Sequence, residues 1–294
     1  TKSLSTGSNF EFNGSSTQAT GTLMPSTVNN ITINNLSGVT LSQATTVSGT
    51  LALTTGLLIL GSNVLTLGTS ATIAGTPSAT NMIVAVGTGE LRKNFASTGS
   101  FTFPVGDNTG TAEYSPVTLN FTSGTFSSAY CGLKLSNAKH PNNTSATDYL
   151  TRYWTVASSG ITDFSCNATF NYVQADVAGT ETNIYCGAYN GASWTLYNVA
   201  TDVTNQLTAT VSTFSDFTGG EQGALPVELT SFSANVVMNE VILNWSTATE
   251  TNNYGFEVER RIIGETADRW NTIGFVASAG TSNSPHEYSY SDNN

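Results

Sequence analysis

Ile31-Thr-Ile33, Leu51-Ala-Leu53 and Ala71-Thr-Ile73 recur at a spacing of twenty residues, and this repeat decides the fold of the first part of the chain. Each segment places apolar residues on either side of a small or polar one, which is the period of two expected of a β-strand. The β-branched residues and the glycines between the segments disfavour a helix. Short strands in repeats of about twenty residues are typical of a β-solenoid, whose coils cover one another's apolar interior. We therefore predict a β-solenoid over residues 27–82, with an ordinary β-meander as the alternative.

The chain before the repeat is rich in Ser, Thr, Gly and Asn. Its one substantial apolar feature is Phe10-Glu-Phe12, whose alternation suits a strand. We expect residues 1–26 to form a polar N-terminal arm. Phe10 and Phe12 are then the candidate assembly strand, which pairs with another copy of the protein.

Residues 83–218 hold longer, aromatic-rich strands separated by turn clusters such as Asn190-Gly-Ala-Ser193. About eight such strands at this spacing predict an antiparallel β-sandwich, jelly-roll-like or immunoglobulin-like. Gly219-Gly-Glu-Gln-Gly-Ala224 has the composition of a flexible hinge, so residues 219–226 are predicted to be a linker.

Residues 227–294 alternate apolar and polar side chains, for example at Val241, Leu243 and Trp245. Strands are expected near residues 228–236, 240–247, 254–262, 270–278 and 286–292. A β-sandwich built from such strands usually has about seven of them, so we expect the module to lack strands at its C-terminal end. An incomplete sandwich exposes backbone donors and an apolar groove, which favours addition of a strand by a partner. The predicted fold class of the whole chain is all-β.

Several pieces of this last module resemble the fibronectin-III-like domain of type IX secretion cargo proteins. They are Leu225-Pro-Val-Glu-Leu-Thr-Ser-Phe232, Leu243-Asn-Trp-Ser-Thr-Ala-Thr-Glu250, Asn252-Asn-Tyr-Gly-Phe-Glu-Val-Glu-Arg260, Trp270-Asn-Thr-Ile-Gly-Phe-Val276 and Ser284-Pro-His-Glu-Tyr-Ser-Tyr290. The central region is similar to a companion module of the same proteins at Phe101-Thr-Phe-Pro-Val-Gly-Asp107 and Tyr149-Leu-Thr-Arg-Tyr-Trp-Thr-Val156. The resemblance implies a secreted or outer-surface bacterial protein. Such proteins also carry a sorting domain, which is expected to be cleaved on export.

The composition argues against two classes of binding partner, nucleic acid and membrane. Only 10% of residues are charged and the formal net charge is −11, without a basic patch, which argues against nucleic acid. No apolar run reaches the ~18–20 residues that a membrane helix needs, so membrane insertion is not expected.

Few residues carry a signal for chemistry. No GxSxG, HExxH or P-loop motif occurs, and we predict no enzymatic activity. His140 and His286 lie in different modules and are interpreted as turn residues, and Glu257 and Glu259 as a solvated strand face. Asp107, in Asp-Asn-Thr-Gly110, is a weak calcium candidate, with a plain turn preferred.

The aromatic and cysteine residues leave further alternatives. Trp154 is expected in the core rather than in a carbohydrate platform with Arg152, and Trp194 is the candidate ligand contact. Cys166 and Cys186 flank a turn and form a candidate cross-strand disulfide, which would leave Cys131 unpaired. The alternative is three small buried residues.

These features favour a non-enzymatic extracellular structural protein. We expect a subunit of a bacterial surface fibre, stalk or adhesive layer, with copies joined by β-strand addition. One alternative is a monomeric carbohydrate-binding or adhesin module that contacts surface glycans through Trp194. The other is an accessory region of a larger secreted enzyme.

Overall fold

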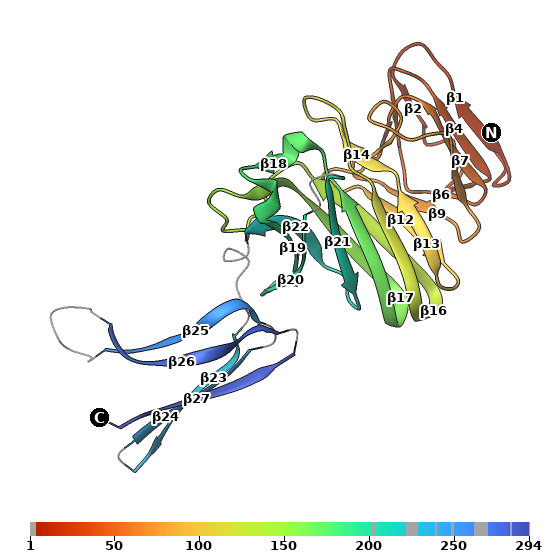
Figure 1. Cartoon of the computed structure of the whole chain (residues 1–294). Helices are drawn as coiled ribbons and strands as arrows, with labels where there is room; N and C mark the ends of the chain where they lie inside the picture. Colours follow the sequence, from red (N-terminus) through yellow and green to blue (C-terminus); the bar gives the residue numbers. More distant parts are fainter. Residues whose placement is uncertain are drawn as a thin grey trace. The chain divides into compact units, whose positions relative to one another are not determined.

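The computed structural model describes residues 4–200, 204–221, 229–238, 240–247, 250–261, 270–282 and 284–293, and confirms the all-β class (Figure 1). The chain forms two compact units. The first unit comprises Thr1–Gly191 and Tyr197–Ala224, and the second comprises Ala192–Leu196 and Leu225–Asn294. In the described part of the chain, no helix is long and apolar enough to span a membrane.

The first unit begins with a β-solenoid whose coils each place one strand in each of three sheets. Its strands, coil by coil, are β1 (Asn9–Phe12), β2 (Gln18–Ala19) and β3 (Thr27–Val28); β4 (Asn30–Asn34), β5 (Val39–Thr40) and β6 (Thr45–Val47); β7 (Thr50–Thr55), β8 (Leu58–Ile59) and β9 (Val64–Leu67); and β10 (Thr72–Ala74), β11 (Ile83–Val84) and β12 (Glu90–Phe95). Pairing between coils is parallel, with Leu51 opposite both Ile31 and Ile73. The three side chains therefore stack along one side of the solenoid, although the spacing of twenty predicts Ala71 rather than Ile73 opposite Leu51.

The segment predicted to be an N-terminal arm is instead the first coil of this solenoid. β1 pairs with β4, with Phe10 opposite Ile31 and Phe12 opposite Ile33. Phe12 is 9% exposed, so it contributes to the apolar interior rather than to a free strand. The physical reason is periodicity, because Phe10 and Phe12 precede their partners by twenty-one residues, which is one coil.

The solenoid passes into the sandwich without a break near residue 82. β12 is parallel to β9 on one side and antiparallel to β16 (Val117–Ser136) on the other. Leu91 thus lies between Leu65 and Leu133, and all three are fully buried. One twelve-stranded sheet consequently joins the regions that the sequence divides at 82/83.

The sandwich is built around two long strands, β16 and β17 (Tyr149–Asn171), which pair with each other through most of their length. One part of β17 pairs with β21 (Gln206–Val211), and another with β22 (Asp216–Glu221). Rings from the two parts meet in the core, since the Trp154 and Phe170 centroids are 5.4 Å apart. The prediction that Trp154 is a core residue is confirmed, because it has no exposed surface.

Short elements complete the first unit: β13 (Gly99–Phe103), β14 (Val105–Asp107), β15 (Glu113–Tyr114), η1 (Gln174–Asp176), β18 (Val177–Ala178), η2 (Glu181–Asn183), β19 (Ile184–Tyr189) and β20 (Trp194–Val199). β20 lies at the edge of the large sheet, next to β19. Residues 194–196 of this strand belong to the second compact unit.

The predicted glycine linker is partly wrong. Gly219 and Gly220 are buried inside β22, which pairs with both β17 and β19. A Cβ at Gly219 would lie 2.5 Å from Ile184 Cγ2 and 2.8 Å from Leu150 Cγ. Close packing therefore explains the glycine at 219, whereas residues 222–226 of the predicted linker lie outside the described residues.

The second unit contains β23 (Leu229–Val237), β24 (Glu240–Thr247), β25 (Glu250–Arg260), β26 (Asn271–Ser282) and β27 (His286–Asp292), close to the five ranges expected from the sequence. They form an antiparallel sheet in the order β23-β24-β27 and a separate antiparallel pair, β25-β26. Among the described residues of this unit, the buried hydrophobic side chains are Trp245, Val258 and, in the segment Ala192–Leu196, Trp194. This unit therefore has a much smaller core than the first.

Candidate functional site

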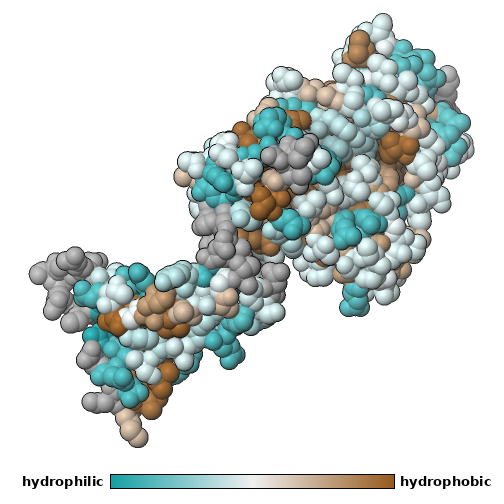
Figure 2. Space-filling view, in the orientation of Figure 1, coloured by the Kyte–Doolittle hydropathy of each residue, from teal (hydrophilic) through white to brown (hydrophobic). Residues whose placement is uncertain are grey.

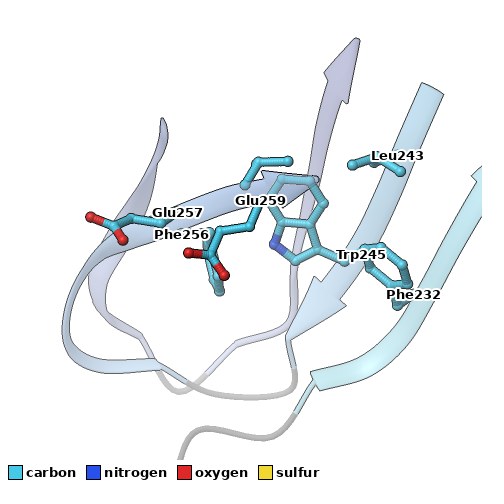
Figure 3. Close-up of a pocket in the computed structure, with 7 residues that line it drawn as sticks. Phe232, Leu243, Trp245, Phe256, Glu257 and Glu259 are labelled. Carbon is cyan, nitrogen blue, oxygen red and sulfur yellow. The ribbon is translucent and has the colours of Figure 1, made fainter. Parts of the chain in front are cut away.

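The second unit contains an open groove of about 270 Å³ between its two sheets (Figure 3). Seven residues line this open groove: Phe232 from β23; Leu243 and Trp245 from β24; and Phe256, Glu257, Val258 and Glu259 from β25. Most of the lining is apolar, with the two carboxylates at the rim.

The open groove exists because the two-stranded sheet covers only part of the three-stranded one. Trp245 packs against Phe256, with ring centroids 5.4 Å apart, and Phe256 packs against Tyr288 at 4.9 Å. On β23 the same face is uncovered, because Phe232 is 61% and Val236 is 78% exposed. Figure 2 shows hydrophobic side chains on the surface of this unit. Apolar surface left in water is a recurrent feature of interaction sites.

Strand β25 presents a backbone edge to this open groove. It pairs with β26, and in the part of the chain that the structure describes no strand pairs with its other edge. Val258 is buried, whereas Glu257 and Glu259 on either side of it are exposed, as the alternation predicts. An unpaired edge with one apolar face is a template for a further strand.

One polar atom in the open groove lacks a partner. Trp245 is 5% exposed, and its indole nitrogen Nε1 forms no hydrogen bond with any described residue. Figure 3 shows this nitrogen on the side of the ring that faces Glu259 and Phe256. A buried N–H without an acceptor costs about 1–3 kcal/mol.

Other polar contacts hold the two sheets of the second unit together. Glu250 accepts hydrogen bonds from Thr247 Oγ1 at 2.8 Å, from the Ala279 N–H at 3.0 Å and from the Tyr288 hydroxyl. Burial raises the pKa of Glu250, but these hydrogen bonds outweigh it and hold the pKa below its usual value. Arg260 also forms an ion pair of 2.8 Å with Asp292. These contacts fix β25 and β26 against the three-stranded sheet.

The calcium candidate, Asp107, is committed to a buried ion cluster in the first unit. Its Oδ2 accepts from Arg152 Nη1 at 2.6 Å, and its Oδ1 accepts from Asn137 and from the Thr109 N–H, both at 3.0 Å. Arg152 also binds Asp176 Oδ2 at 2.7 Å and Glu113 Oε2. The described residues contain no group of three or more acidic, His or Cys side chains that could hold a metal ion. Asp107 is therefore the last residue of β14 and a buried partner of Arg152, and its Oδ1 accepts from the turn that follows.

The sequence reasoning missed this cluster. An available signal was the single arginine within the apolar-aromatic run Tyr149–Val156, because a charge on a buried strand needs partners. The carboxylates come from β14, β15 and η1, which lie 24 to 45 residues from Arg152, so local sequence patterns do not predict their convergence on it.

Both histidines have structural contacts. The His140 ring is 2% exposed, its Nε2 lies 3.3 Å from Asp216 Oδ2, and its Nδ1 accepts from the Asn142 N–H at 3.2 Å. The ring also packs edge-on against Tyr153. His286 Nε2 lies 2.7 Å from Ser282 Oγ.

The expected disulfide between Cys166 and Cys186 is absent, and all three cysteines are free and buried. Cys186 lies opposite Gly219 of β22, whereas Cys166 on β17 lies opposite Phe121 and Val211. Cys186 therefore neighbours β22, which pairs with the first part of β17, whereas Cys166 lies in the other part of β17, next to β21. The alternative of small buried residues is the better description.

Trp194, the candidate ligand contact, is the first residue of β20 and is 4% exposed. A carbohydrate platform needs an exposed ring, so Trp194 does not supply one in this structure.

Comparisons with known proteins yield no match: no family model, no curated protein and no solved structure matches the chain. The solenoid and the antiparallel sheets are therefore established by the structure alone. The fibronectin-III-like and type IX secretion assignments remain predictions from sequence resemblance.

Proposed function

We propose that this chain belongs to a non-enzymatic extracellular structural protein, a subunit of a bacterial surface fibre, stalk or adhesive layer, whose copies join by β-strand addition. The observation that carries the proposal is the open groove of the second unit, where an apolar sheet face and the edge of β25 are both uncovered. Strand addition would satisfy the backbone edge and bury the apolar face in one step.

The construction of the first unit supports a spacer or stalk role. The solenoid and sandwich share one continuous sheet, so they form a single body rather than two hinged ones. Lys93 strengthens their junction, because its ammonium donates to the carbonyl oxygens of Gly68, Thr69 and Ala71 at 2.7, 2.9 and 2.8 Å. A body of this kind suits transmission of force along a chain of subunits.

The segment Phe10–Phe12, expected from the sequence to be the assembly strand, does not serve as a donor in this structure. Phe10 and Phe12 are paired within their own chain, and Phe12, Met24 and Val28 are buried in the first coil. Phe10 and Phe12 are therefore not available as a donor strand, and we propose that the contact between copies lies at the second unit instead.

Location outside the cell is also part of the proposal. The support is the low share of charged residues, 10%, and the resemblance of residues 225–290 to secreted cargo proteins. The alternative of a carbohydrate-binding module gains nothing from Trp154 and Trp194, because both are buried.

The test is the mass of the whole chain in solution as a function of concentration, by light scattering, followed by electron microscopy. We expect concentration-dependent assemblies that are lost in the double variant Phe232→Asp/Val236→Asp. Both side chains are exposed, so the variant should keep its fold. The matched control is Leu36→Asp, which is 79% exposed in the first unit and should assemble normally. A chain that stays monomeric at every concentration would contradict the proposal.

A further inference from the structure

We infer that the open groove accepts one extended strand in which apolar residues alternate with basic ones, and that this strand pairs with β25. The inference rests on the proposed function for the idea of strand addition. It goes further because it specifies the chemistry of the incoming strand and excludes an identical copy of β25 as that strand.

The apolar half of the pattern follows from the geometry of β25. A strand added beside it would project every second side chain toward the interior, because successive residues of a strand face opposite sides. Those side chains would meet Phe256 and Val258 from β25, and Leu243 and the exposed Phe232 from the facing sheet. All four contacts are hydrophobic, so the inward positions call for apolar residues.

The basic half of the pattern follows from charge. Glu257 and Glu259 are exposed on the outward face of β25, and in the described part of the chain neither forms an ion pair. Directly opposite residues on a neighbouring strand lie about 4.5–5.5 Å apart, where opposite charges attract and like charges repel. The outward residues of the incoming strand should therefore be Lys or Arg.

The same argument disfavours pairing of β25 with β25 of a second copy. Such pairing would bring the Glu257 and Glu259 carboxylates of two chains onto one face, within a protein of formal net charge −11. Nearby cations do not offset this repulsion between carboxylates, since Arg260 is bound to Asp292 and Arg261 stacks over Trp270.

The experiment measures binding of labelled peptides to the whole chain by fluorescence anisotropy. The probes are a nine-residue peptide alternating Val and Lys with Thr at both ends, the same peptide with Glu in place of Lys, and a peptide of identical composition with its Val residues clustered. We expect the alternating basic peptide to bind at least about tenfold more tightly than either of the others, and more weakly as salt is raised. Hydrogen exchange should slow along β25 when it binds.

A charge-reversal variant makes the test specific. Glu257→Lys/Glu259→Lys changes only exposed side chains and should reverse the preference, so that the acidic peptide binds better. The matched control is Glu11→Lys/Glu240→Lys, at exposed positions outside the open groove, and it should leave the preference unchanged. Equal binding of all three peptides, or an unchanged preference after charge reversal, would overturn the inference.

Failure of this inference can be told apart from failure of the proposed function. A chain that assembles by itself but ignores the basic peptide retains the proposed function and loses the inference. A chain that remains monomeric but binds the basic peptide along β25 retains the inference and loses the proposed function.

Discussion

Arg152 and Asp107 are joined by a 2.6 Å contact between Nη1 and Oδ2, and neither side chain has any exposed surface. The same guanidinium reaches Asp176 and Glu113, so one cation serves three carboxylates. Burying this many charges carries a large desolvation cost, which only close hydrogen bonding offsets. The cluster ties β17 to β14, β15 and η1, and thereby fixes the part of the sandwich nearest the solenoid's last strands.

Replacing Arg152 by Met should destabilise the first unit by about 3–5 kcal/mol, because the carboxylates would stay buried without their cation. Urea denaturation followed by circular dichroism would measure the loss. Arg92→Met is the matched control, since Arg92 is 33% exposed and pairs with Glu90, and surface pairs contribute about 0–1 kcal/mol. Equal losses in the two variants would show that the buried cluster contributes no more to the free energy of unfolding than the Arg92–Glu90 pair.

Glu113 gives the cluster a pH dependence of definite sign. Burial raises its pKa above the usual 4.5, with Asp176 and Asp107 adding to the rise against the opposing effect of Arg152. The folded state then holds this proton at a pH where the unfolded state has released it, so ionised Glu113 costs stability and protonation relieves the cost. In Glu113→Gln that contribution is missing.

The stability of wild type relative to Glu113→Gln should therefore rise as the pH falls from neutrality toward 4.5, the ordinary value of the carboxyl. Urea midpoints of both proteins at several pH values within that window provide the measurement. A difference that shrinks on acidification would mean that the ion pair with Arg152 dominates, and that the pKa of Glu113 is lowered instead.

Much of the fold was predictable because it rests on local periodicity. The period-two pattern at Val241, Leu243 and Trp245 identified a strand whose partners the structure supplies in β23 and β27. The spacing of twenty residues likewise identified coils, because each coil must place an equivalent apolar residue at the same point of the interior. Patterns of this kind can be recognised in the sequence without knowledge of the tertiary contacts.

Composition misled the prediction where a residue's role depends on its neighbours in space. The polar residues around Phe10 and Phe12 suggested an arm, yet the solenoid needs only those two inward side chains from β1. Gly219 and Gly220 suggested a hinge, yet the structure uses them in a crowded strand. For the candidate site, alternation located Glu257 and Glu259 on the outer face, but the open groove depends on which strands pair, and this was not encoded locally.

Gly219→Ala tests the packing explanation of that glycine. Its Cβ would lie 2.5 Å from Ile184 Cγ2, so β19 or β22 would have to shift, at a cost of about 1–3 kcal/mol. Gly7→Ala is the matched control, because the nearest atom to its Cβ would be Ser5 Oγ at 3.9 Å. Thermal unfolding of both variants would measure the difference, and a stabilised Gly219→Ala protein would restore the flexible-linker interpretation.

The three cysteines offer a direct test of the strand order in the sandwich. Burial raises the pKa of Cys166 and that of Cys186, each to about 12, and it also raises the pKa of Cys131. At neutral pH these thiols should therefore be protonated and shielded, and the folded protein should react very slowly with a thiol reagent. In guanidinium without reductant, all three should react.

A Cys166–Cys186 disulfide would leave one reactive thiol in the unfolded protein instead of three, so the titration separates the two arrangements without a mutation. A disulfide needs Cα atoms within about 7 Å, but Cys186 lies opposite Gly219 of β22, whereas Cys166 lies in the part of β17 that pairs with β21. A single reactive thiol would accordingly require β19 to lie against that part of β17. The thiol count thus reports on the strand arrangement that places Cys186 beside β22 and Cys166 beside β21.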